Sequence, residues 1–257
     1  MKNINIDNTK KSLLKASRYS KPFIGNFSEM NIIVPNLMEG NTFLSMAILS
    51  PETEIIGENA FHGDISLESV VGNPQIISND AFSFCSKLKN INFEHISSIG
   101  ERAFQYSGLK KITFGPNLKI IKESAFSGCL DLKEIDLANV ENIEHHSFES
   151  TGLLSVTLSP KLKKIGNQAF EGCIFLKNVI CLTPHPPRIC ESTFNGAALE
   201  KIWVVNERIK EEFLQARYWK NYAEKIEVID WVAASEFAQR LRDRDKERTE
   251  NVTFSLF

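Results

Sequence analysis

Hydrophobic and polar residues follow a repeating order through most of this chain. Phenylalanine marks one position of the repeat at Phe61, Phe82, Phe104, Phe126, Phe148, Phe170 and Phe194. The spacings between them are 21, 22, 22, 22, 22 and 24 residues. Each follows a small residue and comes five positions after an isoleucine, as in IGENAF at 56–61 and IGERAF at 99–104. A fixed period of this length predicts stacked coils, because one short coil cannot bury its own phenylalanine.

Runs of alternating hydrophobic and polar residues form the second regular feature. They occupy 88–93, 109–114, 132–137, 154–158, 176–181 and 199–204. Alternation with period two predicts strands with one buried face, which add in parallel about 4.8 Å apart to form one sheet. We expect a left-handed backbone at the glycines in the turns before the strands, which are Gly108, Gly128, Gly152, Gly172 and Gly196.

These patterns predict a repeat solenoid with one parallel sheet, short turns or helical turns on its convex side, and a helical C-terminal cap. A weaker partial coil at 43–57 precedes the array. Residues 206–226 are predicted to form one helix that covers the last coil with Ile209, Phe213, Trp219, Tyr222 and Ile226. The predicted division is 1–40 as N-terminal flank and cap, 41–205 as solenoid, 206–230 as C-terminal cap and 231–257 as charged helical tail.

The residues that face outward from the predicted sheet fall into two ladders. One is Asn92, Thr113, Asp136, Thr157, Ile180 and Trp203, and the other is Asn90, Lys111, Glu134, Ser155, Asn178 and Lys201. Most are polar, as on a solvated face. Ile180 and Trp203 differ, because large hydrophobic side chains are typical of interface centres. The alternative is that the C-terminal segment folds over these two residues. Our candidate ligand-binding residues are Asn92, Lys111, Thr113, Glu134, Asp136, Thr157, Ile180 and Trp203.

The segment LKKITFGPNLKIIKESAFSGCLDLKEIDL at 109–137 resembles the BspA-like, treponemal-type leucine-rich repeats, and the resemblance extends over about 43–204. Residues 203–226 resemble the closing segment of that family, although Val205 and Asn206 stand where proline is usual and Phe213 stands where tyrosine is common. The resemblance implies an open, curved solenoid that contacts a protein or a glycan. It also implies a secreted or cell-surface protein associated with adhesion.

Composition narrows the function further. The net charge of −2 argues against nucleic acid as a partner, which requires a basic stripe. No hydrophobic run approaches the roughly 20 residues of a transmembrane helix. The first 23 residues lack the hydrophobic core and cleavage site of a secretory signal. The sequence alone therefore favours the cytoplasm, whereas the resemblance favours the cell surface.

Candidate chemistry is sparse. Cys85, Cys129 and Cys173 fall two coils apart, roughly 10 Å, which predicts buried core residues rather than disulfides. The adjacent His145 and His146 are expected to point apart, so we predict no metal site. No phosphate loop, nucleophile elbow or zinc-protease motif is present.

We therefore expect a protein that is not an enzyme and needs no cofactor. The leading hypothesis is an adhesin-like module that binds a protein or glycan on its sheet. The alternative is a cytoplasmic scaffold or assembly component that binds a partner through the tail at 231–257.

Overall fold

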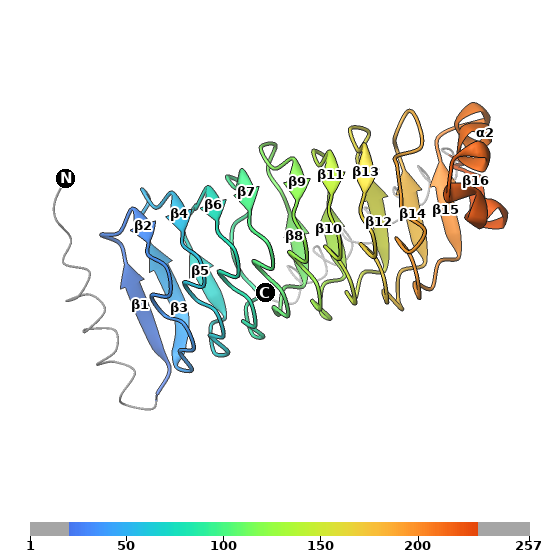
Figure 1. Cartoon of the computed structure of the whole chain (residues 1–257). Coiled ribbons are helices and arrows are strands. Elements are labelled where there is room, and N and C mark those ends of the chain that lie inside the picture. Colours follow the sequence, from blue (N-terminus) through green and yellow to red (C-terminus); the bar gives the residue numbers. More distant parts are fainter. Residues whose placement is uncertain (1–20, 231–257) are drawn as a thin grey trace, which may run out of the picture.

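The computed structural model describes residues 21–230 and forms a single solenoid whose coils stand side by side in a row (Figure 1). The predicted tail at 231–257 and the first twenty residues of the N-terminal flank lie outside the described residues. Each coil places a strand or an extended segment on one side of the solenoid. Most coils also place a two-residue strand on another side (Figure 1).

The longer strands form what we call the main sheet, and every pairing in it is parallel. It has two parts. The first contains β1 (Phe23–Phe27), β3 (Leu44–Leu49) and β5 (Ser69–Val71). The second contains β8 (Lys111–Thr113), β10 (Glu134–Asp136), β12 (Ser155–Leu158), β14 (Asn178–Cys181), β15 (Lys201–Val204) and β16 (Ile226–Val228).

The main sheet is therefore not the one continuous sheet that the sequence predicts. The expected strand at 88–93 is reduced to a single bridge between Ser69 and Asn90. The Asn92 side chain accepts a hydrogen bond from the Glu94 N–H at 3.0 Å, and the equivalent Asp136 makes the same local bond within the paired strand β10, so this bond alone does not explain the break. The prediction of a strand here was wrong, although the solenoid continues through the break.

Two-residue strands form a second set of parallel pairings, which we call the second sheet. Its first part contains β2 (Ile32–Ile33), β4 (Ile55–Ile56), β6 (Ile76–Ile77) and β7 (Ser98–Ile99). Its second part contains β9 (Ile120–Ile121), β11 (Asn142–Ile143) and β13 (Lys164–Ile165). In each of these strands the second residue is a buried isoleucine, and the first residue faces outward. The constant five-residue spacing between isoleucine and phenylalanine thus places the isoleucines in a second line of contact between coils.

The repeat phenylalanines form the centre of the core. From Phe61 to Phe194 each ring stacks on the next, with centroids 5.2 to 5.6 Å apart and ring planes within 2 to 14° of parallel. The small residues that precede the rings are fully buried, for example Ala60 and Ala125. This confirms the predicted solenoid, since each ring is buried against the rings of the neighbouring coils.

The turn glycines serve two different purposes. Gly128, Gly172 and Gly196 have φ values of 72°, 65° and 68°, in the left-handed region as predicted. Gly108 and Gly152 do not. A Cβ at Gly108 would lie 2.3 Å from the Ser86 carbonyl oxygen, and a Cβ at Gly152 would lie 2.1 Å from the Leu130 carbonyl oxygen. These two glycines are needed because the backbone of the preceding coil approaches closely.

The N-terminal flank is more regular than the sequence indicates. Strand β1 pairs with β3, and β2 pairs with β4, so Phe23–Ile33 forms a coil in register with the next one. The flank and cap predicted over 1–40 thus contains paired strands from Phe23 onward. The irregular spacing of its hydrophobic residues hid this coil from repeat analysis.

The C-terminal end differs from the single helix predicted over 206–226. An α-helix, α2 (Glu207–Gln215), is followed by the 3-10 helix η1 (Trp219–Lys225) and then by β16. Helix α2 begins at Asn206, whose side-chain oxygen accepts a hydrogen bond from the Ile209 N–H at 3.0 Å. The C-cap residue Ala216 has extended geometry, which ends the helix. Ile226 is therefore buried as a residue of strand β16 and not as part of a helix.

Candidate ligand-binding face

The candidate residues on the main sheet lie in the register that the repeat alignment predicts. Asp136 pairs with Thr113 on one side and Thr157 on the other, and Ile180 pairs with Trp203. Their burial alternates with that of the core residues between them. The strands therefore hold this row of side chains at a fixed spacing. Their role in binding stays a prediction.

The middle of this face is polar and exposed. Lys111 and Glu134 form an ion pair of 2.6 Å, with side chains 67% and 65% exposed. Such an exposed pair contributes about 0–1 kcal/mol to stability, so it leaves both groups accessible to a ligand. Asp136 accepts a hydrogen bond from the Ala138 N–H at 2.9 Å. Ammonium, carboxylate and hydroxyl groups thus lie on adjacent strands of the face.

Ile180 and Trp203 form a half-buried hydrophobic pair at the C-terminal end of the face. The Trp203 Nε1–H donates to Asn178 Oδ1 at 3.1 Å, which holds the indole against the neighbouring strand. Strand β16 lies beside β15, so that Glu227 is the neighbour of Trp203 in the sheet. The described part of the C-terminal segment therefore extends the sheet beside these residues.

A groove opens at the break in the main sheet. It has a volume of about 820 Å³. Its lining residues are Val70, Val71, Gly72, Asn73, Lys89, Asn90, Ile91, Asn92, Lys110 and Lys111. The candidates Asn92 and Lys111 belong to this groove, whereas Ile180 and Trp203 lie several strands away. The candidate face therefore has two chemically different ends.

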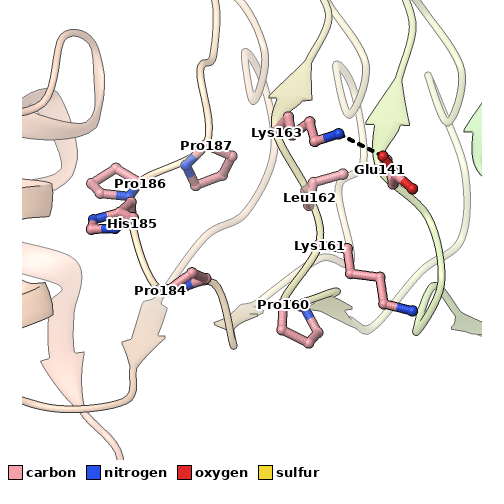
Figure 2. Close-up of a pocket in the computed structure, with 9 residues that line it drawn as sticks. All are labelled: Glu141, Pro160, Lys161, Leu162, Lys163, Pro184, His185, Pro186 and Pro187. Atoms are coloured by element: carbon pink, nitrogen blue, oxygen red, sulfur yellow. Dashed lines mark hydrogen bonds and ion pairs between the residues drawn. The ribbon is translucent and has the colours of Figure 1, made fainter.

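A second groove of about 560 Å³ lies beside the loops that leave β12 and β14 (Figure 2). Four prolines line it, together with Glu141, Lys161, Leu162, Lys163 and His185. The Lys163 Nζ lies 2.6 Å from Glu141 Oε2, and this hydrogen bond and charge hold the pKa of Glu141 below its usual value. Sequence reasoning missed this groove, although the segment PHPP at 184–187 is a signal of an ordered loop.

Phe84 and Tyr106 form an exposed aromatic pair that the sequence reasoning also missed. Their rings stack with centroids 5.0 Å apart, and His62 packs edge-on against Phe84. Both aromatic residues have positive φ, 61° and 55°, where equivalent turns carry Gly63 and Gly128. A bulky residue in this conformation carries strain. The spacing of two residues after the repeat phenylalanine could have identified the pair.

The side chains of His145 and His146 point apart, as expected. His145 Nδ1 accepts a hydrogen bond from the Asn167 N–H at 3.2 Å, whereas His146 Nδ1 lies 3.1 Å from Glu149 Oε2. Atoms of His146, Glu149 and Glu171 lie within 4.8 Å of one another. Both carboxylate oxygens of Glu171 accept hydrogen bonds from side-chain amides. Glu171 thus joins Gln168 of its own coil to Asn195 of the next coil.

All five cysteines are free, and those at 85, 129, 173 and 181 are buried as core residues. Burial raises the pKa of the Cys129 thiol to about 11. The Cys129 sulfur lies 3.3 Å from Ser107 Oγ of the preceding coil. A thiol held protonated in this way is a poor nucleophile and serves packing.

Comparison with known families agrees with this architecture. The family described as BspA type leucine rich repeat region matches residues 53–177 in six copies. A leucine rich cell surface protein from Faecalibacterium prausnitzii A2-165 has a similar structure, with a TM-score of 0.58 and 24% identity. The match covers 61% of this chain and 44% of that protein. This likeness shows the fold. A comparison with curated proteins returns no match.

Two further solved structures are similar at lower sequence identity. A leucine-rich repeat protein from Bacteroides ovatus ATCC 8483 is 21% identical, with a TM-score of 0.42 and coverage of 66% of this chain and 57% of that one. The T. pallidum leucine rich repeat protein is 20% identical, with a TM-score of 0.33 and coverage of 62% and 58%. The matches span about half the length of these three proteins. Among residues 21–230, no helix is long and apolar enough to cross a membrane.

Proposed function

We propose that the solenoid, whose residues 53–177 match the BspA type leucine rich repeat region, is a non-catalytic module that holds a protein or glycan on the main sheet. The row of outward residues from Asn92 to Trp203 forms the binding face. The observation that carries the proposal is the half-buried Ile180–Trp203 pair, in register on adjacent strands at the end of a row whose other members, from Asn92 to Thr157, are polar. A rigid hydrophobic anchor surrounded by polar groups is typical of recognition surfaces.

The proposed location of this module is the cell surface, where it acts in adhesion. The similar protein from F. prausnitzii is described as a cell surface protein. The geometry also suits this role, because a solenoid presents an extended face that contacts large partners. Repeated coils supply similar groups at regular spacing, whereas catalysis needs dissimilar groups that converge on one point.

The first test is a binding screen with matched variants. The whole chain is immobilised and probed with arrays of purified glycans and purified extracellular proteins. We expect Trp203→Ala and Ile180→Ala each to weaken binding of the captured ligand about tenfold or more, as expected at an interface centre. The matched control is Ile120→Ala, since Ile120 is 40% exposed on the second sheet.

Thermal unfolding of every variant separates binding from stability. The proposal requires the melting temperature of Ile180→Ala to stay near that of the wild type while binding falls. Two outcomes contradict it: the captured ligand binds both sheet variants as tightly as the wild type, or the Ile120 control loses as much affinity as they do.

A further inference from the structure

The groove at the break in the main sheet contains backbone groups that have no partner. Among residues 21–230, the N–H and C=O groups of Ile91 and Asn92 make no backbone hydrogen bond. Elsewhere in the main sheet such groups pair with the next strand. Exposed, unpaired backbone groups can form hydrogen bonds with a ligand. The break therefore adds donors and acceptors to the centre of the face.

The side chains around this groove carry positive charge. Lys89, Lys110 and Lys111 line it, and no carboxylate does. Lys111 is paired with Glu134, whereas no ion pair in the described residues involves Lys89 or Lys110. These two lysines stand at equivalent positions of adjacent coils, in LKNINF and LKKITF. Like charges at equivalent positions of adjacent coils repel each other, so a bound anion would relieve that repulsion.

Amide side chains complete the lining. Asn92 Nδ2 donates to Asn73 Oδ1 at 2.8 Å, and Asn90 Nδ2 donates to Ser69 Oγ at 3.1 Å. These bonds fix the orientation of the amides, and Asn90 Oδ1 and the side-chain N–H groups of Asn73 have no partner in the described residues. Amides placed in this way supply both donors and acceptors, as hydroxyl groups require.

This composition favours a saccharide over a peptide. Protein interfaces are enriched in aromatic residues and arginine and depleted in lysine. The groove has three lysines and three asparagines, and its exposed hydrophobic side chain is Val71. A chain that carries many hydroxyls and regularly spaced anionic groups matches amides, backbone groups and lysines together.

We propose that this groove binds an anionic saccharide chain, with Lys89 and Lys110 contacting its carboxylate or sulfate groups. The amides and the backbone of Ile91 and Asn92 contact its hydroxyls. This inference rests on the proposed function, because it names the ligand class for one end of the same face. Carboxylated and sulfated saccharides share this ligand chemistry. They differ in the anionic group that they present to the lysines.

The test measures binding of defined hexamers to the whole chain by calorimetry. The probes are hexagalacturonate, a heparin-derived hexasaccharide, neutral maltohexaose and hexaglutamate. We expect one or both anionic saccharides to bind, and their relative affinity distinguishes carboxylate from sulfate. The double variant Lys89→Gln/Lys110→Gln should weaken that binding about tenfold or more, with a smaller salt dependence than the wild type shows.

The matched control is Lys164→Gln/Lys220→Gln, which removes the same charge at two exposed lysines away from the groove. It should bind like the wild type. Absence of binding by both anionic saccharides overturns the inference. An equal loss of affinity in the control also overturns it, because it would mean a general charge effect. Hexaglutamate binding as tightly as the saccharides overturns it too, because it would mean an acidic peptide site. Ligand binding that depends on Trp203 but not on Lys89 and Lys110 would contradict this inference and leave the proposed function standing.

Discussion

Asp64 is a single residue whose chemistry departs from the repeat. It stands three positions after Phe61, where other coils have Cys85, Ser107 or Thr151. Its Oδ1 accepts a hydrogen bond from the Asn41 N–H at 2.8 Å, while the buried Oδ2 has no partner in the described residues. Burial raises the pKa of this carboxyl from 3.8 to about 9. The folded protein therefore holds a proton on Asp64 at neutral pH.

This raised pKa predicts a pH-dependent stability. The unfolded chain loses the Asp64 proton above about pH 4 and the folded chain above about pH 9, so the free energy of unfolding falls as pH rises between these values. We expect Asp64→Asn, which keeps an oxygen acceptor for Asn41, to be more stable than the wild type by about 4 kcal/mol at pH 7, for a shift of about three pH units. The two proteins should be similar at pH 4.

Urea unfolding at pH 4, 5.5, 7 and 8.5 measures this difference. Asp131→Asn is the matched control, because its carboxyl is exposed. Parallel stability profiles for the wild type and Asp64→Asn would show that the carboxyl does not retain its proton.

At the scale of elements, α2 and η1 close the C-terminal end of the core. Phe213 is fully buried, and its ring lies 4.8 Å from that of Trp219. Trp219 in turn packs against Phe194, the last ring of the stack, and donates a hydrogen bond to the Pro187 carbonyl at 2.7 Å. The helices therefore continue the aromatic core past the last repeat.

Removing this contact should loosen the end of the solenoid first. Phe213→Ala is expected to cost about 3–5 kcal/mol, the range for a large buried aromatic. In a stack where each coil contacts its neighbours, the effect should be greatest in β14 and β15 and smallest in β3 and β5. Hydrogen exchange of the backbone amides measures it, with Glu211→Ala on the exposed side of α2 as control. Faster exchange of equal size in all strands would contradict a local capping role.

The sequence predicts those elements whose side chains repeat and fails where the backbone decides the structure. Buried rings such as Phe126 and the register of Asp136 with Thr113 follow from spacing alone. The run INF at 91–93 has the same alternation as its neighbours, but the pairing of this coil in the main sheet is limited to the bridge between Ser69 and Asn90. Repeat analysis could not find the groove, because the groove results from hydrogen bonds that this coil does not make.

The candidate site shows the same division. Its outward residues were identified from alternation, and the half-buried state of Trp203 was not, since it depends on a hydrogen bond to Asn178 and on the neighbouring strand β16. Strand β16 lies beyond a change from helix to strand within 206–226, where the hydrophobic spacing fits either structure. Tertiary pairing decides such segments.

At the scale of the whole molecule, two parallel sheets face different directions and offer different surfaces (Figure 1). The outward residues of the second sheet include Ile76 and Ile120, which are 37% and 40% exposed. The main sheet offers a lysine-rich groove at its break and a hydrophobic pair at its C-terminal end. We assign recognition to the main sheet, because among residues 21–230 its strands hold charged, amide and aromatic groups in one rigid row.

Hydroxyl-radical footprinting of the protein with the ligand captured on the arrays tests this assignment most directly. Trp203 and Ile180 on the main sheet are compared with Ile76 and Ile120 on the second sheet, and all four side chains are open enough to react. The account predicts that the ligand lowers oxidation of Trp203 and Ile180 several-fold and leaves the second-sheet isoleucines unchanged. Protection of Ile76 and Ile120, with Trp203 and Ile180 oxidised as in the free protein, would place the ligand on the second sheet and contradict the account.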